Sequence, residues 1–222
     1  MADPLKQRLL AGIEALELQV NETQIDQLLE YLALIIRWNK AFNLTAIRDP
    51  DAMVVKHLLD SLAVCHCIAE PGVTESPKRV IDVGTGAGLP GIPLAIVFPG
   101  KQLALLDSNG KKTRFLFQVK TQLGLSNIDI IDSRVENFHP TQPFDAVISR
   151  AFASLDRMVD SCAHLLAPDG VMFAMKAASV AEEIEEMGDR ANLLACHDLV
   201  VPFLGEARSL VTLKQKISAV AD

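Results

Sequence analysis

The sequence predicts an α/β fold in which a mainly parallel, seven-stranded sheet follows a helical N-terminal segment. Three observations lead to this prediction. Apolar residues recur at helical spacing through residues 3–68. Short apolar runs then alternate with helical ones, which is typical of a doubly wound sheet. The last two apolar runs lie too close together for a helix between them, so they predict an antiparallel hairpin at the C-terminal end of the sheet.

The N-terminal segment divides into three expected helices. The first two carry apolar residues every three or four positions, and Asn21 and Gln24 form a capping pair before the second. The third follows Asp49-Pro50, a favourable helix start. Periodicity ends in the Pro- and Gly-containing residues 71–77. We therefore expect a helical extension over residues 1–72 and a second unit over residues 73–222.

The second unit alternates between strands and helices. Helices are expected at 90–98, 110–123, 153–166 and 179–190. The expected strands are Arg79–Val83, Gln102–Leu106, Ile128–Ile131, Phe144–Ser149, Val171–Lys176, Leu199–Leu204 and Ser209–Lys216, the last two joined by Gly205-Glu206.

Composition excludes several classes of protein. The 222 residues are 50% hydrophobic and 22% charged, which indicates a globular protein with a real core. The net charge of −7 argues against bulk binding of nucleic acid, and 5% aromatic residues argue against a stacking platform for single-stranded RNA. Positive charge gathers locally, because residues 77–120 hold seven basic and two acidic groups. A polyanionic partner would have to use that local patch.

The sequence shows neither a leader-like start nor an uncharged apolar run of about eighteen residues. We therefore expect a cytoplasmic protein with no membrane partner and, in addition, a monomer. The four cysteines contain no C-x-x-C pair and are expected to be reduced. Cys65-His66-Cys67 has the wrong spacing for a structural zinc site, so we expect no metal.

A glycine-rich turn follows the first expected strand. It reads Asp82-Val83-Gly84-Thr85-Gly86-Ala87-Gly88 and leads into a helix. Glycines let the backbone approach a ligand closely and adopt positive φ. Asp107 ends the next strand, about twenty residues on, where a carboxylate can bind both hydroxyls of a ribose. The two features together predict a nucleotide-like ligand.

The turn favours S-adenosylmethionine over a dinucleotide. Dinucleotide sites seat a pyrophosphate on the amides of the following helix, and Pro90 removes one of those amides. The acidic strand end and the G-x-G turn look like the first motif of S-adenosylmethionine-dependent methyltransferases, whose ligand has no phosphate. A dinucleotide-dependent oxidoreductase is the alternative, although the single tyrosine, Tyr31, gives no Tyr-x-x-x-Lys pair. A non-catalytic binder that keeps the fold is the third hypothesis.

Longer strings of sequence resemble the RsmG family, also called GidB, from about Asn39 to Lys214. The resemblance implies a class I, Rossmann-like methyltransferase sheet with a helical N-terminal extension. It also implies N7 methylation of one guanine in 16S rRNA, as free RNA or within a small-subunit particle, with S-adenosylmethionine as donor. The strings are Asn43-Leu44-Thr45, Lys56-His57-Leu58-Leu59-Asp60-Ser61-Leu62, Asp82 to Ala95, Leu106-Asp107-Ser108 and Phe144 to Ala153.

Carried over by position, the family's cofactor contacts fall on Gly84, Leu89, Val135, Glu136 and Arg150. Asp107 matches the ribose-binding acid of the wider methyltransferase class. The chain departs from the family pattern at Met175-Lys176-Ala177 and by one extra residue at Gly205 to Ser209, which leaves the placing of Lys176 and Arg208 open.

The residues also constrain the chemistry. The fourth strand ends Ser149-Arg150-Ala151-Phe152, without the N-P-P-[YF] string of many exocyclic-amine methyltransferases and without a nearby Cys. Guanine N7 already has an in-plane lone pair and no proton, so its methylation requires alignment rather than a base. We assign no catalytic residue.

Several further residues have two open interpretations. His57 and Asp60 lie three apart, and either point into the site or make a cap or an interdomain bond. One group of cations, which either follows the RNA backbone or forms an ordinary solvated helix face, consists of Lys101, Lys111, Lys112 and Arg114. A second group, which we expect to form an RNA-facing rim, consists of Arg37, Lys40 and Arg48. Trp38 lies among the second group, and we favour a core position for it.

Overall fold

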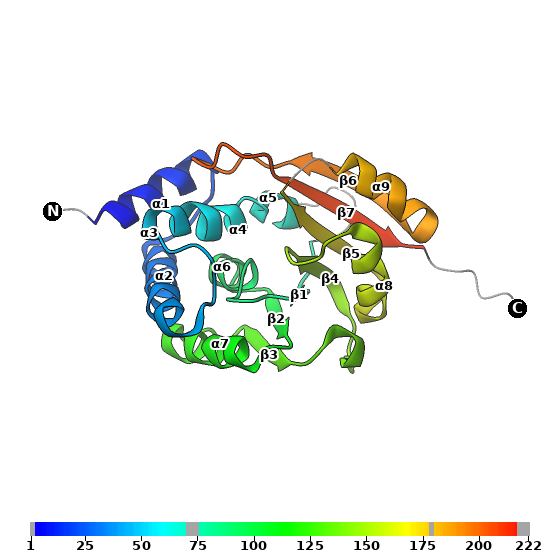
Figure 1. The fold of residues 1–222 in the computed structure, drawn as a ribbon, viewed down its shortest axis with the longest axis horizontal. Coiled ribbons are helices and arrows are strands. Elements are labelled where there is room, and N and C mark those ends of the chain that lie inside the picture. The colour runs from blue at the N-terminus through cyan, green and yellow to red at the C-terminus, as the bar shows by residue number, and fades with distance from the viewer. Residues whose placement is uncertain (1–2, 70–75, 178–179, 217–222) are drawn as a thin grey trace, which may run out of the picture.

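A computed structural model describes residues 3–69, 76–177 and 180–216. In it a single seven-stranded sheet with the order β3-β2-β1-β4-β5-β7-β6 has helices on both faces (Figure 1). The strands are β1 (Arg79–Val83), β2 (Gln102–Asp107), β3 (Ile128–Asp132), β4 (Phe144–Ser149), β5 (Leu166–Lys176), β6 (Ala191–Asp198) and β7 (Ser209–Gln215).

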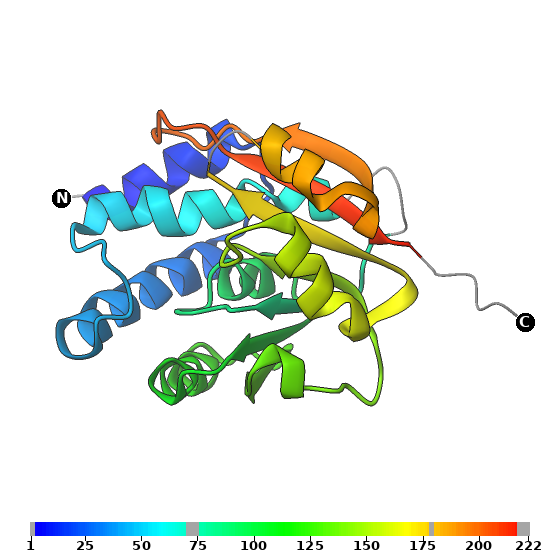
Figure 2. The same cartoon turned by 45° about the vertical axis from the view of Figure 1, so that its right-hand side comes forward.

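The N-terminal helices and the first two crossover helices cover one face of the sheet, and α8 and α9 cover the other, as Figure 2 shows from a second side. The first layer holds α1 (Pro4–Ala15), α2 (Glu22–Phe42), α3 (Pro50–Met53), the π-helical turn η1 (Val54–Leu59), α4 (Asp60–Leu62), α5 (Cys65–Ala69), α6 (Gly91–Val97) and α7 (Gly110–Leu123). The second holds α8 (Leu155–Cys162) and α9 (Ala181–Met187), and the 3-10 turns are η2 (Val135–Asn137), η3 (Ala163–Leu165) and η4 (Gly188–Arg190).

Local signals explain where the long helices begin and end. Asn21 and Gln24 form the predicted capping box at the start of α2, with both hydrogen bonds at 3.0 Å. Asn109 caps α7, and Gly124 ends it at φ +64°. The predicted range 110–123 for α7 is therefore confirmed to the residue.

The parallel part of the sheet positions the site. Strands β1 to β5 run parallel, so their carboxyl ends lie at one edge. The predicted β1 and β4 ranges are confirmed, and β2 and β3 each extend one residue further. The expected helix 153–166 is shorter, because α8 stops at Cys162 and β5 already begins at Leu166.

The predicted antiparallel hairpin is present, but the prediction of its first strand is wrong. Strand β7 pairs with β5 and with β6 at 191–198, whereas 199–208 forms the connection. Pro202 lacks an N–H for a ladder, and Val201 is buried in the core shared with the N-terminal helices. Phe203 stacks under Arg8 of α1 at 4.1 Å. The Leu199 amide of this apolar run still pairs across the connection, with the Arg208 carbonyl at 2.8 Å, and beyond it Val201 packs against the helices while Val200 is exposed.

Other differences are local. The expected helical stretch 3–68 is interrupted at residues 43–49, where Asn43 ends α2 in the left-handed region at φ +49°. The expected helix 179–190 is α9 followed by η4. The expected division between residues 72 and 73 lies outside the described residues and stays a prediction.

The segment Pro50–Ala69 is long and apolar enough to cross a membrane by length and composition alone, with a mean hydropathy of 1.5. Two-thirds of that stretch is buried inside the protein, where Leu58, Leu59 and Leu62 belong to the core. Its apolar character is accounted for by packing on the sheet layer.

Candidate functional site

The glycine turn after β1 forms the centre of the site. Gly84 and Gly86 adopt φ of +71° and +63°, which L side chains rarely take. A Cβ on Gly84 would lie 2.9 Å from Ala151 Cβ. Glycine is therefore required at both positions, and the turn presents bare backbone at the carboxyl edge of the sheet.

Asp82 supports this turn from below. It is fully buried, and its Oδ2 accepts hydrogen bonds from Thr85 Oγ1 at 2.7 Å and from the Gly91 amide at 2.8 Å. Burial raises the pKa of Asp82 to about 6, although both hydrogen bonds favour the charged form. Its role is to fix the turn against the start of α6.

Asp107 closes the turn from the neighbouring strand. Its Oδ2 accepts from the Gly86 amide and its Oδ1 from the Asn109 amide, each at 2.9 Å. Lys112 Nζ lies 3.4 Å from Oδ2. A carboxylate oxygen has more than one acceptor position, so the two oxygens can still bind a diol. The turn and Asp107, paired in the sequence analysis by spacing, are joined here by a hydrogen bond.

Three neighbouring cavities follow the carboxyl edge. The first, of about 300 Å³, is lined by Gly84, Asp107, Val135 and Glu136, among others. The second, of about 240 Å³, also uses Gly84 and adds Leu89 and Arg150. The predicted cofactor residues thus line two adjoining cavities that share Gly84 and Ala151.

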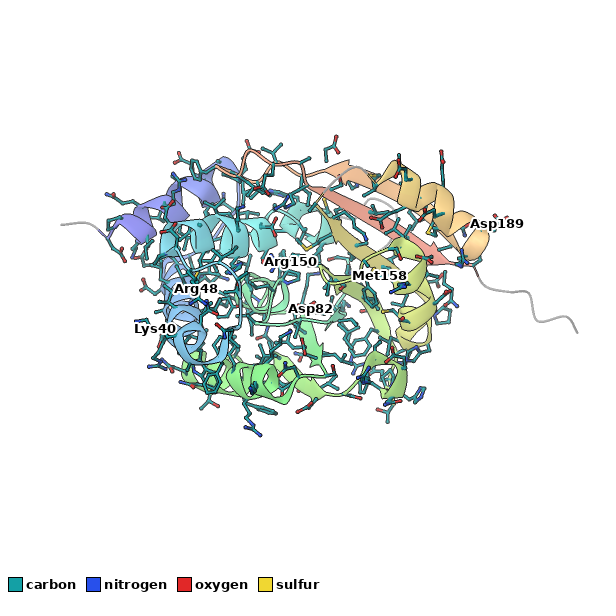
Figure 3. The ribbon with its side chains drawn as sticks, viewed as in Figure 1. Lys40, Arg48, Asp82, Arg150, Met158 and Asp189 are labelled. Carbon is teal, nitrogen blue, oxygen red and sulfur yellow. The ribbon has the colours of Figure 1, made fainter. Side chains whose placement is uncertain are left out.

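The third cavity is the largest, about 610 Å³. It shares Thr45, His57 and Arg150 with the second cavity and Phe152 with the first. The three spaces therefore form one cleft between the sheet edge and the N-terminal helices. Figure 3 shows Arg150 and Asp82 near the centre of the molecule, with Lys40 and Arg48 toward the side of α2.

Arg150 holds the junction of the cavities. Its Nη1 donates to Asp60 Oδ2 at 2.8 Å and to the Lys56 carbonyl at 3.1 Å. Lys56 belongs to the π-helical turn η1, and such turns occur frequently at functional sites. Arg208 Nε donates to the other oxygen of Asp60 at 3.0 Å. Asp60 thus joins the end of β4 to the loop before β7.

His57 lies on the same turn with 3% of its surface exposed, and neither ring nitrogen has a hydrogen-bond partner within the described part of the chain. Burial, reinforced by Arg150, lowers the pKa of His57 to about 4. The ring is therefore neutral at pH 7. Both residues line the third cavity, as the first interpretation of His57 and Asp60 requires. Asp60 also makes the bonds between distant parts of the chain that the second interpretation requires, so both hold for Asp60.

The predicted cations separate into different places. Lys101 lies at the amino end of β2, tied to Ser76 Oγ and the Pro77 carbonyl at 2.7 Å each, away from the cleft. Lys112 lines the first cavity. Lys111 and Arg114 are exposed on α7, so the four do not form one row.

On the α2 side, Arg37, Lys40 and Arg48 are exposed, and Arg48 donates to Asn43 Oδ1 at 3.2 Å. Trp38 packs edge-on against Phe115 and donates to Gln118, in agreement with the core interpretation.

Sequence reasoning missed several residues of the cleft. Tyr31, fully buried on α2, donates to the Ala87 carbonyl in the glycine turn at 2.7 Å. Asn39 accepts from the Thr45 amide at 2.9 Å and shapes the segment that lines the second and third cavities. A polar residue at a position of α2 that the helical period places in the core was the available signal in both cases.

Lys176 and Arg208, whose placing was open, both line the third cavity. Lys176 is 8% exposed, forms an ion pair with Glu183 at 2.7 Å and donates to the Phe152 carbonyl. Across residues 3–69, 76–177 and 180–216, no group of three or more His, Cys, Asp or Glu side chains is arranged to hold a metal ion.

Comparison with known proteins identifies relatives over nearly the whole chain. The family model described as GidB, rRNA small subunit methyltransferase G, matches residues 24–211. The chain is 49% identical over 208 residues to Ribosomal RNA small subunit methyltransferase G of Hydrogenovibrio crunogenus, covering 94% of this chain and 93% of the relative. The protein of that name from Saccharophagus degradans is 50% identical over 210 residues, with 95% and 91% covered.

Solved structures with low sequence identity share the fold. The N-methyltransferase NodS from Bradyrhizobium japonicum in complex with S-adenosyl-L-homocysteine aligns with a TM-score of 0.55 at 12% identity, covering 78% of this chain and 94% of NodS. A SAM-dependent methyltransferase from Aquifex aeolicus aligns with a TM-score of 0.56 at 17% identity, with 77% and 96% covered. The predicted class I methyltransferase fold is confirmed.

Proposed function

The chain belongs to the rRNA small subunit methyltransferase G family, and from that premise we propose that it transfers a methyl group from S-adenosylmethionine to N7 of one guanine in 16S rRNA. The observation that best supports this function is the continuous cleft at the carboxyl edge of the sheet. Two of its cavities hold the predicted cofactor residues, and the third opens beside them. A donor site that adjoins a larger acceptor space is what group transfer between two substrates requires.

The residues of the first two cavities fit S-adenosylmethionine. The bare backbone at Gly84 and Gly86 leaves room that a Cβ would fill, and the Asp107 carboxylate lies beside it to bind a ribose. We assign Val135 and Glu136 to the adenine end, and Leu89 and Arg150 to the methionine end. The start of α6 offers few hydrogen-bond donors to a pyrophosphate, because Pro90 has no N–H and the Gly91 amide already donates to Asp82.

We assign the third cavity to the acceptor base. S-adenosylmethionine, when bound, supplies an electrophilic methyl group on a sulfonium. Phe152, half-buried, offers an apolar wall for a purine, and Lys176 and Arg150 line the same space. His57 is neutral at pH 7, so it adds no positive charge where the base becomes cationic on methylation. Guanine N7 has no proton to remove, so we assign alignment to these residues and general-base catalysis to none.

Exposed cations at the rim support an RNA acceptor. Within the described part of the chain, Arg37, Lys40, Arg48, Lys111 and Arg114 are exposed and form no ion pair with an acidic side chain. Lys111 and Arg114 lie on either side of Lys112, which lines the first cavity, and Arg48 follows Ile47, which lines the third. Exposed cations without an ion-pair partner can contact phosphates of a bound RNA. We also propose a cytoplasmic monomer that uses neither a metal nor a membrane.

The direct test maps modified bases in 16S rRNA by mass spectrometry, in cells with and without this protein. Loss of a single 7-methylguanine on deletion, restored by purified protein with S-adenosylmethionine, is the expected result. Free 16S rRNA and small subunits from the deletion strain are offered separately as acceptors. An unchanged 7-methylguanine content on deletion would overturn the assignment of the acceptor, whereas calorimetric binding of S-adenosylmethionine tests the cofactor alone.

A further inference from the structure

Glu206 joins two cations from distant segments at the lip of the third cavity. Its Oε1 accepts from Lys56 Nζ at 2.9 Å, and its Oε2 accepts from Arg208 Nη2 at 3.1 Å. Lys56 comes from η1 in the N-terminal layer and Arg208 from the loop before β7. Both cations line the cavity that we assign to the acceptor base. The single carboxylate of Glu206 thus binds both Lys56 and Arg208.

Glu206 is not what fixes the Arg208 side chain or the Lys56 main chain. Arg208 Nε is held independently by Asp60 Oδ1, and Asp60 is anchored in turn by Arg150. Lys56 belongs to a helical turn whose main chain accepts a bond from Arg150. The Lys56–Glu206 pair is 40% and 50% exposed, and ion pairs of that exposure contribute little to stability. Loop anchoring therefore does not account for the arrangement.

The arrangement matches the binding of a phosphate group. A phosphate presents several acceptor oxygens, and both the guanidinium of arginine and the ammonium of lysine bind such oxygens through charge-assisted hydrogen bonds. The Glu206 carboxylate supplies two such oxygens to the same two donors. Because it is weakly held and half exposed, a phosphate of higher charge can replace it at small cost.

We propose that Lys56 and Arg208 form a binding site for one RNA backbone phosphate next to the target nucleotide, and that Glu206 covers this site until RNA displaces it. The proposal rests on the proposed function, because it takes the third cavity as the acceptor site. Covering the site lowers affinity for RNA that contacts only these two cations. RNA that also reaches the rim cations compensates for the displacement of Glu206.

The test compares Glu206→Gln with Asp169→Asn in the full-length protein with bound S-adenosylhomocysteine. Asp169 is an exposed carboxylate paired with Lys214 at 2.9 Å, so its variant makes the same change in net charge away from the cleft. Binding of a 16S rRNA transcript is measured over a salt series. We expect Glu206→Gln to bind about three- to tenfold more tightly at low salt, with a steeper salt slope by roughly one phosphate contact. Asp169→Asn should match the wild type within the effect of one charge.

A double variant with Lys56→Gln tests whether the gain in RNA affinity arises at this site. The gain from Glu206→Gln should disappear in the Lys56→Gln protein, because one of the two uncovered cations is then missing. Equal behaviour of Glu206→Gln and Asp169→Asn, or a gain that persists in Lys56→Gln, would overturn the proposal.

The outcome is separable from that of the proposed function. Wild-type protein that methylates 16S rRNA while Glu206→Gln binds RNA like the wild type refutes the phosphate site alone. Wild-type protein that binds S-adenosylmethionine but neither binds nor methylates 16S rRNA refutes both.

Discussion

Gly86 lies where the turn, the Asp107 carboxylate and the cleft meet. Its amide donates to Asp107 at 2.9 Å, and its φ of +63° disfavours any β-branched side chain. A larger residue at position 86 would therefore strain the backbone, and it would do so next to Asp107, the residue that we assign to the ribose. A substitution here should act on the cofactor site more than on the fold.

We expect Gly86→Val to weaken S-adenosylmethionine binding by about tenfold or more, because strain in the turn and the new side chain both disturb the cleft. The affinity is measured by titration calorimetry. The matched control is Gly124→Val, at φ +64° and with open space around it at the end of α7, which should lose stability but keep cofactor affinity. Unchanged affinity in Gly86→Val would contradict the assigned site.

His57 makes the stability of the protein sensitive to acid. The pKa of His57 is about 4 in the folded protein and near its ordinary value of 6.5 in the unfolded chain, so the unfolded chain binds the proton first as the pH falls. The contribution of the neutral His57 ring to the free energy of unfolding is fully present above pH 6.5 and is lost between pH 6.5 and about pH 4. It amounts to about 3 kcal/mol at most.

We therefore expect wild-type protein to lose more stability than His57→Gln between pH 7 and pH 4.5, measured by denaturant unfolding. The control is His197→Gln, because His197 is exposed on β6. This variant should lose as much stability between pH 7 and pH 4.5 as the wild type does. Parallel pH profiles of wild type and His57→Gln would mean that the buried imidazole is not the group that titrates.

At the scale of elements, α7 connects the cofactor side of the cleft with the proposed RNA rim. Lys112 in its first turn lies 3.4 Å from Asp107, whereas Arg114, two residues on, is exposed. Neighbouring positions on one helix thus point to different places, Lys112 to the first cavity and Arg114 to solvent. Binding of the two substrates should be separable by mutation on this helix.

We expect Arg114→Glu to weaken binding of 16S rRNA and to flatten its salt dependence by about one unit, while the affinity for S-adenosylmethionine stays unchanged. The control is Lys78→Glu, an exposed charge reversal before β1, at the opposite edge of the sheet. An unchanged salt slope in Arg114→Glu would remove Arg114 from the interface.

The elements predicted best from the sequence are those whose bounds are set by local residues and not by contacts with distant parts of the chain. Strand β1 and helix α7 have clear periodicity and clear ends, and their ranges are confirmed. Strand β6 was missed because it lies at the edge of the sheet and is mostly exposed, so its residues lack an alternating pattern. The apolar run 199–204 was taken for a strand because its burial comes from the N-terminal helices, which local sequence does not reveal.

The same distinction applies to the cleft. The glycine turn and Asp107 could be found by spacing, because adjoining strands of a parallel sheet bring their ends together. Lys56 could not, since it reaches the site from the N-terminal layer through a contact 94 residues apart in sequence, and for Tyr31 the polar position on the core side of α2 was the one available signal.

At the scale of the whole molecule, the N-terminal helices and the sheet share one core. A single buried cluster contains Leu9 of α1, Leu28 of α2, Leu94 of α6 and Phe115 of α7. The N-terminal layer also supplies Tyr31 to the glycine turn. The N-terminal helices therefore contribute both to packing and to the glycine turn that we assign to the cofactor, and removing them would expose apolar surface on α6 and α7.

We expect a fragment of residues 76–222 to lack a cooperative unfolding transition and to bind no S-adenosylmethionine, while the full chain unfolds in one transition. Calorimetry and circular dichroism measure both. A fragment that unfolds cooperatively and binds the cofactor would establish the region after residue 75 as an independent domain.

The π-helical turn at Val54–Leu59 has a consequence for how this segment tolerates length changes. A π turn accommodates one residue more than an α-helical turn. Deleting one residue there would leave an ordinary α-helical turn, and the segments on either side would keep their mutual rotation because the π turn had absorbed the extra residue. The same deletion inside α2 would rotate one side of the helix by about 100° relative to the other. The stretch before Asp60 should therefore tolerate the loss of one residue better than α2 does, with Asp60 still facing Arg150.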